Sequence, residues 1–285
     1  MRLTNIFTNA KIFIKMKTLR FICAVLLTAM IGSNFIACSD DEDENKDEVV
    51  TPPKKLTQMK AIREGLTIDF EYDEKGQLSS AIVTIINGTS TYIHQYDYIW
   101  SGNIIFERTD YTTEATYTLE KGLIKDIQKK NGQYKNTLYF TYNNSKQLST
   151  YKASYMGKDS EYRYNWNNNK ITQMIYHYGE GSYFDPDSTI VSYNGEMAMG
   201  HYPLWFAEIM KADTLKSTSP LLIAHPELIG IGSKHLPSKI IEKYDGNCIF
   251  YYTYSFKEDG YIENCTKKTE SIWGTSMEIY TFKWE

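Results

Sequence analysis

The chain has 285 residues, a formal net charge of −4 and 14% aromatic residues, among which Tyr alone supplies 24. The acidic balance argues against nucleic-acid binding, because proteins of that class present a basic surface. The length is sufficient for a leader and one large domain, and the abundance of Tyr favours half-buried β-strands.

The first 37 residues are predicted to be a secretory signal peptide. Basic residues up to Arg20 precede an apolar run over residues 21–31. This run is too short to cross a bilayer, which takes about 20 apolar residues, and a basic flank before a short apolar run is typical of a signal. Because Met16 begins a more compact signal than Met1 does, both starts stay open.

The next residues, Phe35-Ile36-Ala37-Cys38, resemble a bacterial lipobox. In that resemblance Cys38 is the lipidated first residue of the mature protein. Two or three acyl chains hold a protein firmly on a membrane, so Cys38 is expected to anchor the chain. Residues 38–55 are expected to form a flexible tether, because seven of the nine residues from 40 to 48 are acidic and cannot be buried.

The acidic start of this tether resembles the export tag of lipoproteins from some Gram-negative gut bacteria. The tag would be formed by Ser39, Asp40, Asp41, Glu42 and Asp43. The resemblance implies a position on the outer face of the outer membrane, with the lipid as the attachment to the membrane.

Residues 56–285 are predicted to form an all-β domain of antiparallel hairpins. Their side chains alternate between two faces, so that Leu66, Ile68 and Phe70 share one face and Asp69 lies on the other. A period of two is typical of half-buried strands. Charged residues recur on both faces, which argues against a membrane-spanning barrel with an apolar band toward lipid.

A degenerate repeat joins these strands: an aromatic residue, then turn residues, then an apolar residue that starts the next strand. The best copies are residues 72–78 and 256–262, and residues 142–148 keep the frame without the glycine. Asn, Asp and Gly tolerate the backbone of tight turns. A repeat about one hairpin long predicts a meander that curls into a half-barrel or a barrel.

The aromatic-Asp-x-x-Gly-x-Leu units resemble the YD repeats of Rhs-type shells. Together with the lipobox and the acidic tag, they make the chain similar to a family of surface lipoproteins of unknown function. That resemblance covers residues 56–285 and implies a porin-like β fold. It implies no catalytic residue.

Residues 197–236 interrupt the repeats. Residues 202–211 are predicted to form a short helix with Pro203 in its first turn, and apolar segments follow up to residue 232. This short helical insertion near 200–232 is expected to be either a plug that packs on the sheet or a lid over a pocket.

Cys248 and Cys265 are predicted to remain free thiols. A hairpin that turns at Glu258-Asp259 would pair Cys248 with Thr269 and Cys265 with Tyr252. The two cysteines would then be about 13 Å apart along the strands, whereas a disulfide needs Cα atoms within about 7 Å.

None of the common catalytic or cofactor motifs is present, so no catalytic residue and no cofactor is assigned. The spacings of His201, His225 and His235 match no common zinc site, and no metal is expected. A carboxylate-dependent hydrolase of the glycoside type stays open as an alternative, because its two acids need not be close in sequence.

The aromatic faces of two strands are the candidate ligand-stacking sites: Tyr92, Tyr96, Trp100, Tyr162, Tyr164 and Trp166. Alternatively, these rings pack beneath the insertion or line the interior of the sheet. We therefore expect a lipid-anchored, non-enzymatic and monomeric binding or structural module, whose ligand is a glycan or an outer-membrane partner protein.

Overall fold

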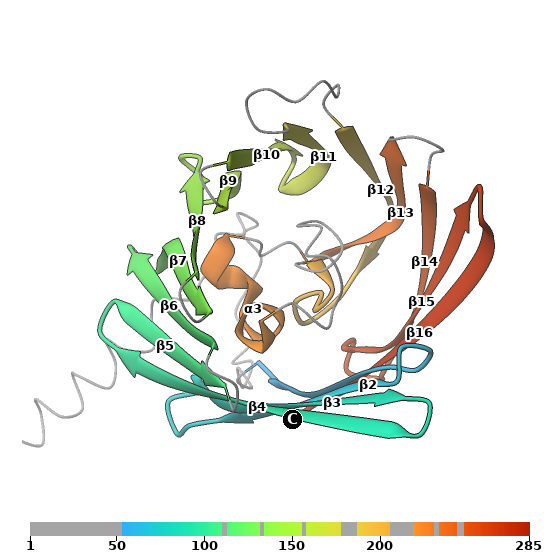
Figure 1. Ribbon diagram of the computed structural model, residues 1–285. Helices are drawn as coiled ribbons and strands as arrows, with labels where there is room; N and C mark the ends of the chain where they lie inside the picture. Colours follow the sequence, from blue (N-terminus) through green and yellow to red (C-terminus); the bar gives the residue numbers. More distant parts are fainter. Residues whose placement is uncertain are drawn as a thin grey trace, which may run out of the picture. The chain divides into compact units, whose positions relative to one another are not determined.

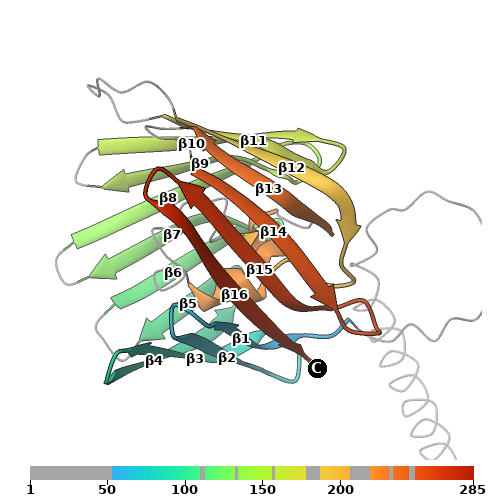
Figure 2. The same ribbon diagram turned by 90° about the vertical axis from the view of Figure 1, so that its right-hand side faces the viewer.

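A computed structural model describes residues 53–109, 113–131, 134–155, 158–177, 187–205, 219–230, 234–243 and 248–285. Its strands form one closed antiparallel barrel in which each strand pairs with its neighbours in sequence and β1 pairs with β16 (Figures 1 and 2). The strands are β1 (Leu56–Ala61), β2 (Leu66–Tyr72), β3 (Leu78–Asn87), β4 (Ser90–Ser101), β5 (Ile104–Thr109), β6 (Thr113–Glu120), β7 (Leu123–Asn131), β8 (Tyr134–Tyr142), β9 (Leu148–Tyr155), β10 (Lys158–Asn167), β11 (Lys170–His177), β12 (Asp187–Met197), β13 (His235–Lys243), β14 (Cys248–Phe256), β15 (Ile262–Ser271) and β16 (Gly274–Trp284). The prediction of an all-β antiparallel meander is confirmed, and the open question of closure is answered by the β1–β16 pairing.

The two ends of the barrel differ in what they carry. At the proximal end, defined by the turns at residues 73–77, 143–147 and 257–261, the N-terminal segment joins the barrel. There the backbones of Lys55 and Glu285 exchange hydrogen bonds of 2.7 and 2.9 Å, and Lys54 forms an ion pair with Asp259 at 2.8 Å. The distal end, defined by the hairpin turns at 62–65, 88–89 and 272–273, lies opposite.

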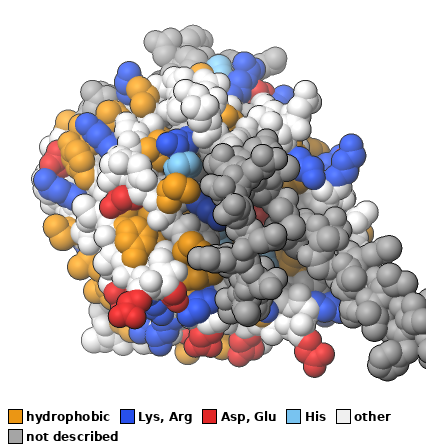
Figure 3. Space-filling model, turned by 180° about the vertical axis from the view of Figure 1, so that it is seen from behind, with side chains coloured by type: hydrophobic (Ala, Val, Ile, Leu, Met, Phe, Trp, Pro, Cys, Tyr) orange, Lys and Arg blue, Asp and Glu red, His pale blue; other side chains and the backbone are white. Residues whose placement is uncertain are grey.

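The alternation of side chains divides the wall into a largely apolar inner face and an outer face of mixed polarity. Leu66, Ile68 and Phe70 are buried inside the barrel, as expected from their spacing. On the outer face Lys152 and Arg163 both pair with Glu161, at 3.0 and 2.6 Å, whereas several isoleucine side chains of β3 to β5 are exposed. Figure 3 shows charged side chains of both signs and hydrophobic side chains scattered over one end of the molecule. The buried apolar core therefore lies inside the barrel.

The sequence repeat corresponds to a recurring hydrogen bond at the proximal end. Most hairpins that are joined at the distal end separate before they reach the proximal end, so a carbonyl near the start of the first strand loses its ladder partner. A Tyr or Trp near the end of the second strand donates to that carbonyl instead. The pairs are Tyr72 to Leu56 (2.8 Å), Trp100 to Leu78 (2.9 Å), Tyr142 to Ile124 (2.5 Å), Trp166 to Leu148 (2.7 Å), Tyr193 to Ile171 (2.8 Å), Tyr254 to Pro237 (2.7 Å) and Trp284 to Ile262 (2.8 Å).

The remaining hairpin explains why its unit lacks the aromatic residue. Strands β5 and β6 stay paired up to Ile104 and Thr118, so no carbonyl is left without a ladder partner. Leu119 occupies the position that an aromatic residue has elsewhere, and its own N–H donates to the Asn103 carbonyl at 2.7 Å. The aromatic residue is therefore found where the strands separate.

The insertion between β12 and β13 is a plug in the part that the structure describes. Tyr202, Leu204 and Trp205 are fully buried, as are most residues of α3 (Pro220–Ala224) and of the 3-10 helix η2 (Pro226–Ile229). Figure 1 shows α3 inside the ring of strands. The helix predicted at 202–211 lies mostly outside the described residues, and the described α-helix is the apolar segment that begins at Pro220. The lid alternative does not fit these buried side chains.

The glycine that ends η2 fixes the plug against the wall. Gly230 has a φ of 66°, and a Cβ atom there would clash with the carbonyl oxygen of Lys146 in the β8–β9 turn. Glycine alone combines this backbone angle with such a close approach. The plug and the turn at 143–147 are therefore in direct contact.

Cys248 and Cys265 form no disulfide with each other, as predicted, and both are buried, but the predicted register is wrong by two residues. Cys265 pairs with Tyr254 instead of Tyr252, and Thr269 pairs with Phe250 instead of Cys248. The physical reason is a wider turn over residues 257–261 together with a register shift at Ser255/Phe256. The pattern of alternating side chains was not affected by this two-residue shift.

Candidate functional site

A ladder of aromatic rings crosses four neighbouring strands on the inner face. The ring centroids of Phe140 and Tyr151 are 5.4 Å apart, those of Tyr151 and Tyr162 are 5.3 Å apart, and those of Tyr162 and Tyr176 are 4.4 Å apart. The last pair is stacked, with an angle of 26° between the rings. We call these four residues the aromatic ladder.

The pairing register produces this ladder. Phe140 faces Tyr151 across β8 and β9, and Tyr151 faces Tyr162 across β9 and β10. Tyr162 in turn faces Tyr176 across β10 and β11. Residues directly opposite one another are about 5 Å apart, so four aromatic residues in register bring neighbouring rings into contact. The three tyrosines are only half-buried, which leaves ring surface accessible to water inside the barrel.

The six ring positions predicted from the sequence all face the interior, but they have different environments. Tyr164 is buried, whereas Trp100 and Trp166 donate to backbone carbonyls at the proximal end. Tyr96 is half-buried and Tyr92 is 52% exposed near the distal end. These residues come from β4 and β10, which are separated by several strands. They therefore form two stripes on a curved wall and no flat platform, and Tyr162 alone belongs to the aromatic ladder.

A buried carboxylate joins the plug to the wall. Glu107 is 4% exposed, and its Oε2 accepts hydrogen bonds of 2.6 Å from both the Tyr117 hydroxyl and the Ser219 hydroxyl. Tyr98 lies beside them, and its hydroxyl accepts from the Leu221 N–H at 3.3 Å. Burial, followed by the neighbouring Glu107 charge, raises the pKa of both Tyr98 and Tyr117, so these phenols keep their protons.

This cluster acts within the protein itself: it binds the plug to the barrel wall and fixes the position of the plug. Two hydroxyl donors satisfy one carboxylate oxygen, which is how a buried charge is tolerated. Because Ser219 immediately precedes α3, the cluster places the start of that helix. Sequence reasoning missed Glu107, although its position two residues after inward-facing Ile105 was a signal that it also points inward.

The histidines of the insertion are held individually. His225 Nδ1 lies 2.7 Å from a Glu227 carboxylate oxygen, and His201 Nε2 lies 3.1 Å from the Ile223 carbonyl oxygen. Burial lowers the pKa of His201 to about 4, so this ring is neutral and its Nε2–H donates. In the part of the chain that the structure describes, no three His, Cys, Asp or Glu residues are arranged to hold a metal ion.

Cys38 and the tag residues Ser39, Asp40, Asp41, Glu42 and Asp43 lie outside the described residues. Among the residues that are described, no helix combines the length and the apolar character needed to cross a membrane.

The architecture is similar to that of two solved porin-like proteins. One, from Bacteroides uniformis, has 14% identity and a TM-score of 0.63 over 82% of this chain and 98% of its own. The other, from Bacteroides vulgatus, has 12% identity and a TM-score of 0.56 over 80% of this chain and 98% of its own. No protein-family model matches the chain, and no curated protein matches it in sequence. At such identities the likeness establishes a porin-like fold, which the sequence resemblance had implied.

Proposed function

We propose that this protein is a lipid-anchored, non-enzymatic binding module of the cell surface, and that its ligand is a glycan. The aromatic ladder carries the proposal. Sites for small ligands are concave and largely aromatic, with a few polar groups that fix orientation. Tyr151, Tyr162 and Tyr176 supply both, because each presents an apolar ring and a hydroxyl group.

The polarity of the wall supports attachment through lipid. Membrane-spanning barrels carry an apolar band on the outside and a polar interior. Here the outward Asp97 faces Arg108 across β4 and β5, and the outward Lys152 pairs with Glu161. These charges interrupt an apolar outer band and the interior holds an apolar core, so a location at the membrane would depend on an anchor such as Cys38.

A glycan array tests the proposal directly. The compact unit of residues 52–285 contains the whole barrel and its core, so it is the natural probe. We expect binding to a subset of glycans, and we expect Tyr162→Ala to weaken it about tenfold, which corresponds to about 1.4 kcal/mol. Tyr139→Ala is the matched control, because Tyr139 is 50% exposed on the outer face of β8.

Two outcomes would contradict the proposal. Equal losses in both variants would remove the aromatic ladder as the site. Release of cleaved sugar from the array would instead favour the glycoside-type hydrolase, whose two carboxyl groups are typically about 5–9 Å apart.

A partner protein is the second candidate ligand, favoured by apolar side chains on the outer face at the distal end. Trp273 is 90% exposed and Ile272 is 67% exposed at the tip of the β15–β16 hairpin. The exposed apolar side chains Met277 and Ile279 extend this surface along β16. Ile62 is also exposed and lies beside them, because its N–H donates to the Ile279 carbonyl at 2.9 Å. Exposed apolar groups of this kind are typical of protein-binding surfaces. Cross-linking in intact cells, with and without Trp273→Ser, would test this candidate.

A further inference from the structure

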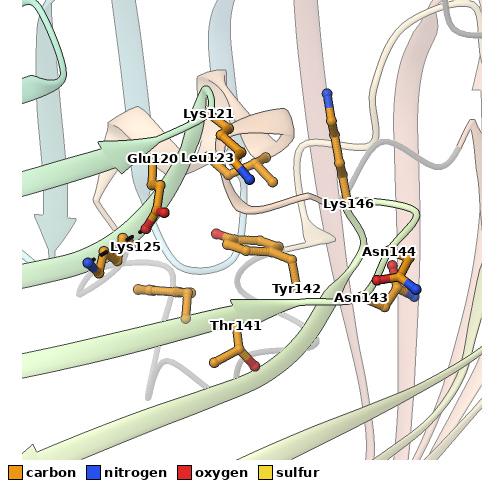
Figure 4. A pocket seen from close by; sticks show the side chains of 10 residues that line it. Glu120, Lys121, Leu123, Lys125, Thr141, Tyr142, Asn143, Asn144 and Lys146 are labelled. Carbon is orange, nitrogen blue, oxygen red and sulfur yellow. Dashed lines mark ion pairs between the residues drawn. The ribbon is translucent and has the colours of Figure 1, made fainter.

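The barrel wall opens between β7 and β8 at the proximal end. Their pairing ends at Asp126 and Tyr139, and the Tyr142 phenol bridges the gap to the Ile124 carbonyl. The opening forms a recess of about 590 Å³, which is within the usual size of a small-ligand site, roughly 300–1,000 Å³ (Figure 4). We call it the β7–β8 recess.

The recess has an excess of positive charge. Its charged lining residues are Lys121, Lys125, Lys146 and Glu120. Glu120 pairs with Lys125 at 3.6 Å, and within the described part of the chain no ion pair involves Lys121 or Lys146. Figure 4 shows Lys121 and Tyr142 facing each other across the recess, with Lys146 rising from the β8–β9 turn beside them.

The backbone at two of these lysines is unusual. Lys121 has a φ of 54° and Lys146 a φ of 60°, and the other described non-glycine residues with positive φ are Asn168 and Asn169. Asparagine tolerates the left-handed region, whereas a lysine there is disfavoured by its Cβ atom. An observed backbone cost of this kind is a reason to look for a function.

A second turn with the same hydrogen bonds shows what is special at Lys146. In the turn at 73–77, Asp73 N–H donates to the Gln77 carbonyl and Gly76 has a φ of 82°. In the turn at 143–147, Asn143 N–H makes the same bond to the Gln147 carbonyl, and Lys146 occupies the glycine position. The turn beside the recess thus has a neutral residue in place of an acid and a cation in place of glycine. Both differences make the recess more positive.

We propose that the β7–β8 recess binds the phosphate group of a small phosphorylated saccharide. Lysine ammonium groups bind phosphate as point charges with several donors. Lys146 and Lys121 would hold the phosphate, and the partly buried ring of Tyr142 would pack against the sugar. The source is either a free sugar phosphate or a phosphorylated headgroup of a membrane lipid. The recess shares Phe140 with the aromatic ladder, whereas Lys121, Tyr142 and Lys146 are not part of the ladder.

The test uses the full-length chain in detergent and measures binding by calorimetry. The probes are glucose 1-phosphate, inorganic phosphate and, for the headgroup source, detergent micelles that contain phosphatidylglycerol. We expect Lys146→Gly to weaken binding about tenfold. The same variant should unfold at an unchanged or higher temperature, because glycine suits a φ of 60°.

Lys75→Ala is the matched control, since Lys75 has the same charge, lies in the equivalent turn at 73–77 and does not line the recess. Binding of glucose 1-phosphate or of the phosphatidylglycerol micelles that is lost in Lys146→Gly and kept in Lys75→Ala supports the site and identifies the source. Equal behaviour of the two variants, or no binding to any probe, overturns it. Tyr162→Ala should leave phosphate binding unchanged, so failure of the ladder proposal and failure of this one are distinguishable.

Discussion

Ser219 connects the plug to the barrel wall through short hydrogen bonds. Its hydroxyl donates to Glu107 at 2.6 Å and lies 2.8 Å from the Tyr117 hydroxyl, which donates to the same carboxylate oxygen. All three side chains are almost fully buried. A hydrogen bond to a charged group in such a place is stronger than a neutral one in contact with water.

We predict that Ser219→Ala lowers the free energy of unfolding by about 1–3 kcal/mol, because Glu107 loses one of its two donors while it stays buried. Urea unfolding followed by fluorescence measures this change. Ser238→Ala is the control: the Ser238 hydroxyl bonds the Ser192 carbonyl in an exposed position, so its loss should change stability little. Equal losses in the two variants would show that the buried cluster has no special role.

At the scale of the elements, the recurring aromatic residue closes the gaps that appear where paired strands separate. In each of seven hairpins a phenol or indole donor replaces a missing N–H of the neighbouring strand. The same aromatic ring also packs against the buried core, for example Trp284, which is 3% exposed. One residue type therefore satisfies a polar group and fills space at the end of the barrel.

We predict that Trp166→Phe destabilises the barrel by about 1–3 kcal/mol, because the Leu148 carbonyl loses its donor at 2.7 Å and the smaller phenyl ring makes fewer packing contacts. Thermal unfolding measures the effect. Trp273→Phe is a control of identical chemistry at a position that is 90% exposed, and it should leave stability unchanged. A destabilisation of Trp273→Phe as large as that of Trp166→Phe would refute the role of the indole–carbonyl bond.

At the scale of the whole molecule, the barrel combines an apolar core with an outer surface of mixed polarity. The interior holds the plug and the apolar core, whereas ion pairs such as Lys268–Glu270 and exposed isoleucines of β3 to β5 share the outside. Inserting the charged groups in a bilayer would cost about 2–4 kcal/mol for a Lys or Arg at the midplane. Under the proposed function, the lipid at Cys38 supplies the attachment to the membrane.

Accordingly, we predict that Cys38→Ala moves the protein from the membrane fraction to the medium or the periplasm. Fractionation of cells with an antibody against the barrel measures the distribution. Neutralising Asp40, Asp41, Glu42 and Asp43 should keep the protein in the membrane but protect it from added protease in intact cells. Membrane retention of Cys38→Ala would contradict the lipobox interpretation.

The sequence by itself determined the all-β class of structure and which residues share one face of a strand. The period of two in β2 and β4 sufficed for the inner face, because each side chain direction follows from its neighbours along the strand. β12 ends at Met197 and β13 begins at His235, so the described residues between these two strands lie within the insertion predicted at 197–236. The repeat was visible because most hairpins need an aromatic donor for a backbone carbonyl that has lost its ladder partner at the proximal end.

Only the tertiary structure decided what depends on pairing between distant residues. Closure required β1 to meet β16, and the aromatic ladder required four strands in one register, neither of which is encoded within a single hairpin. The two-residue error at Cys248 and Cys265 has the same origin, since alternation is unchanged when a strand slips by two. The contact of Glu107 with Ser219 joins residues that are far apart in the chain, and the β7–β8 recess exists because two particular strands separate. Local patterns fix the direction of a side chain, whereas its partners are fixed by the closed barrel.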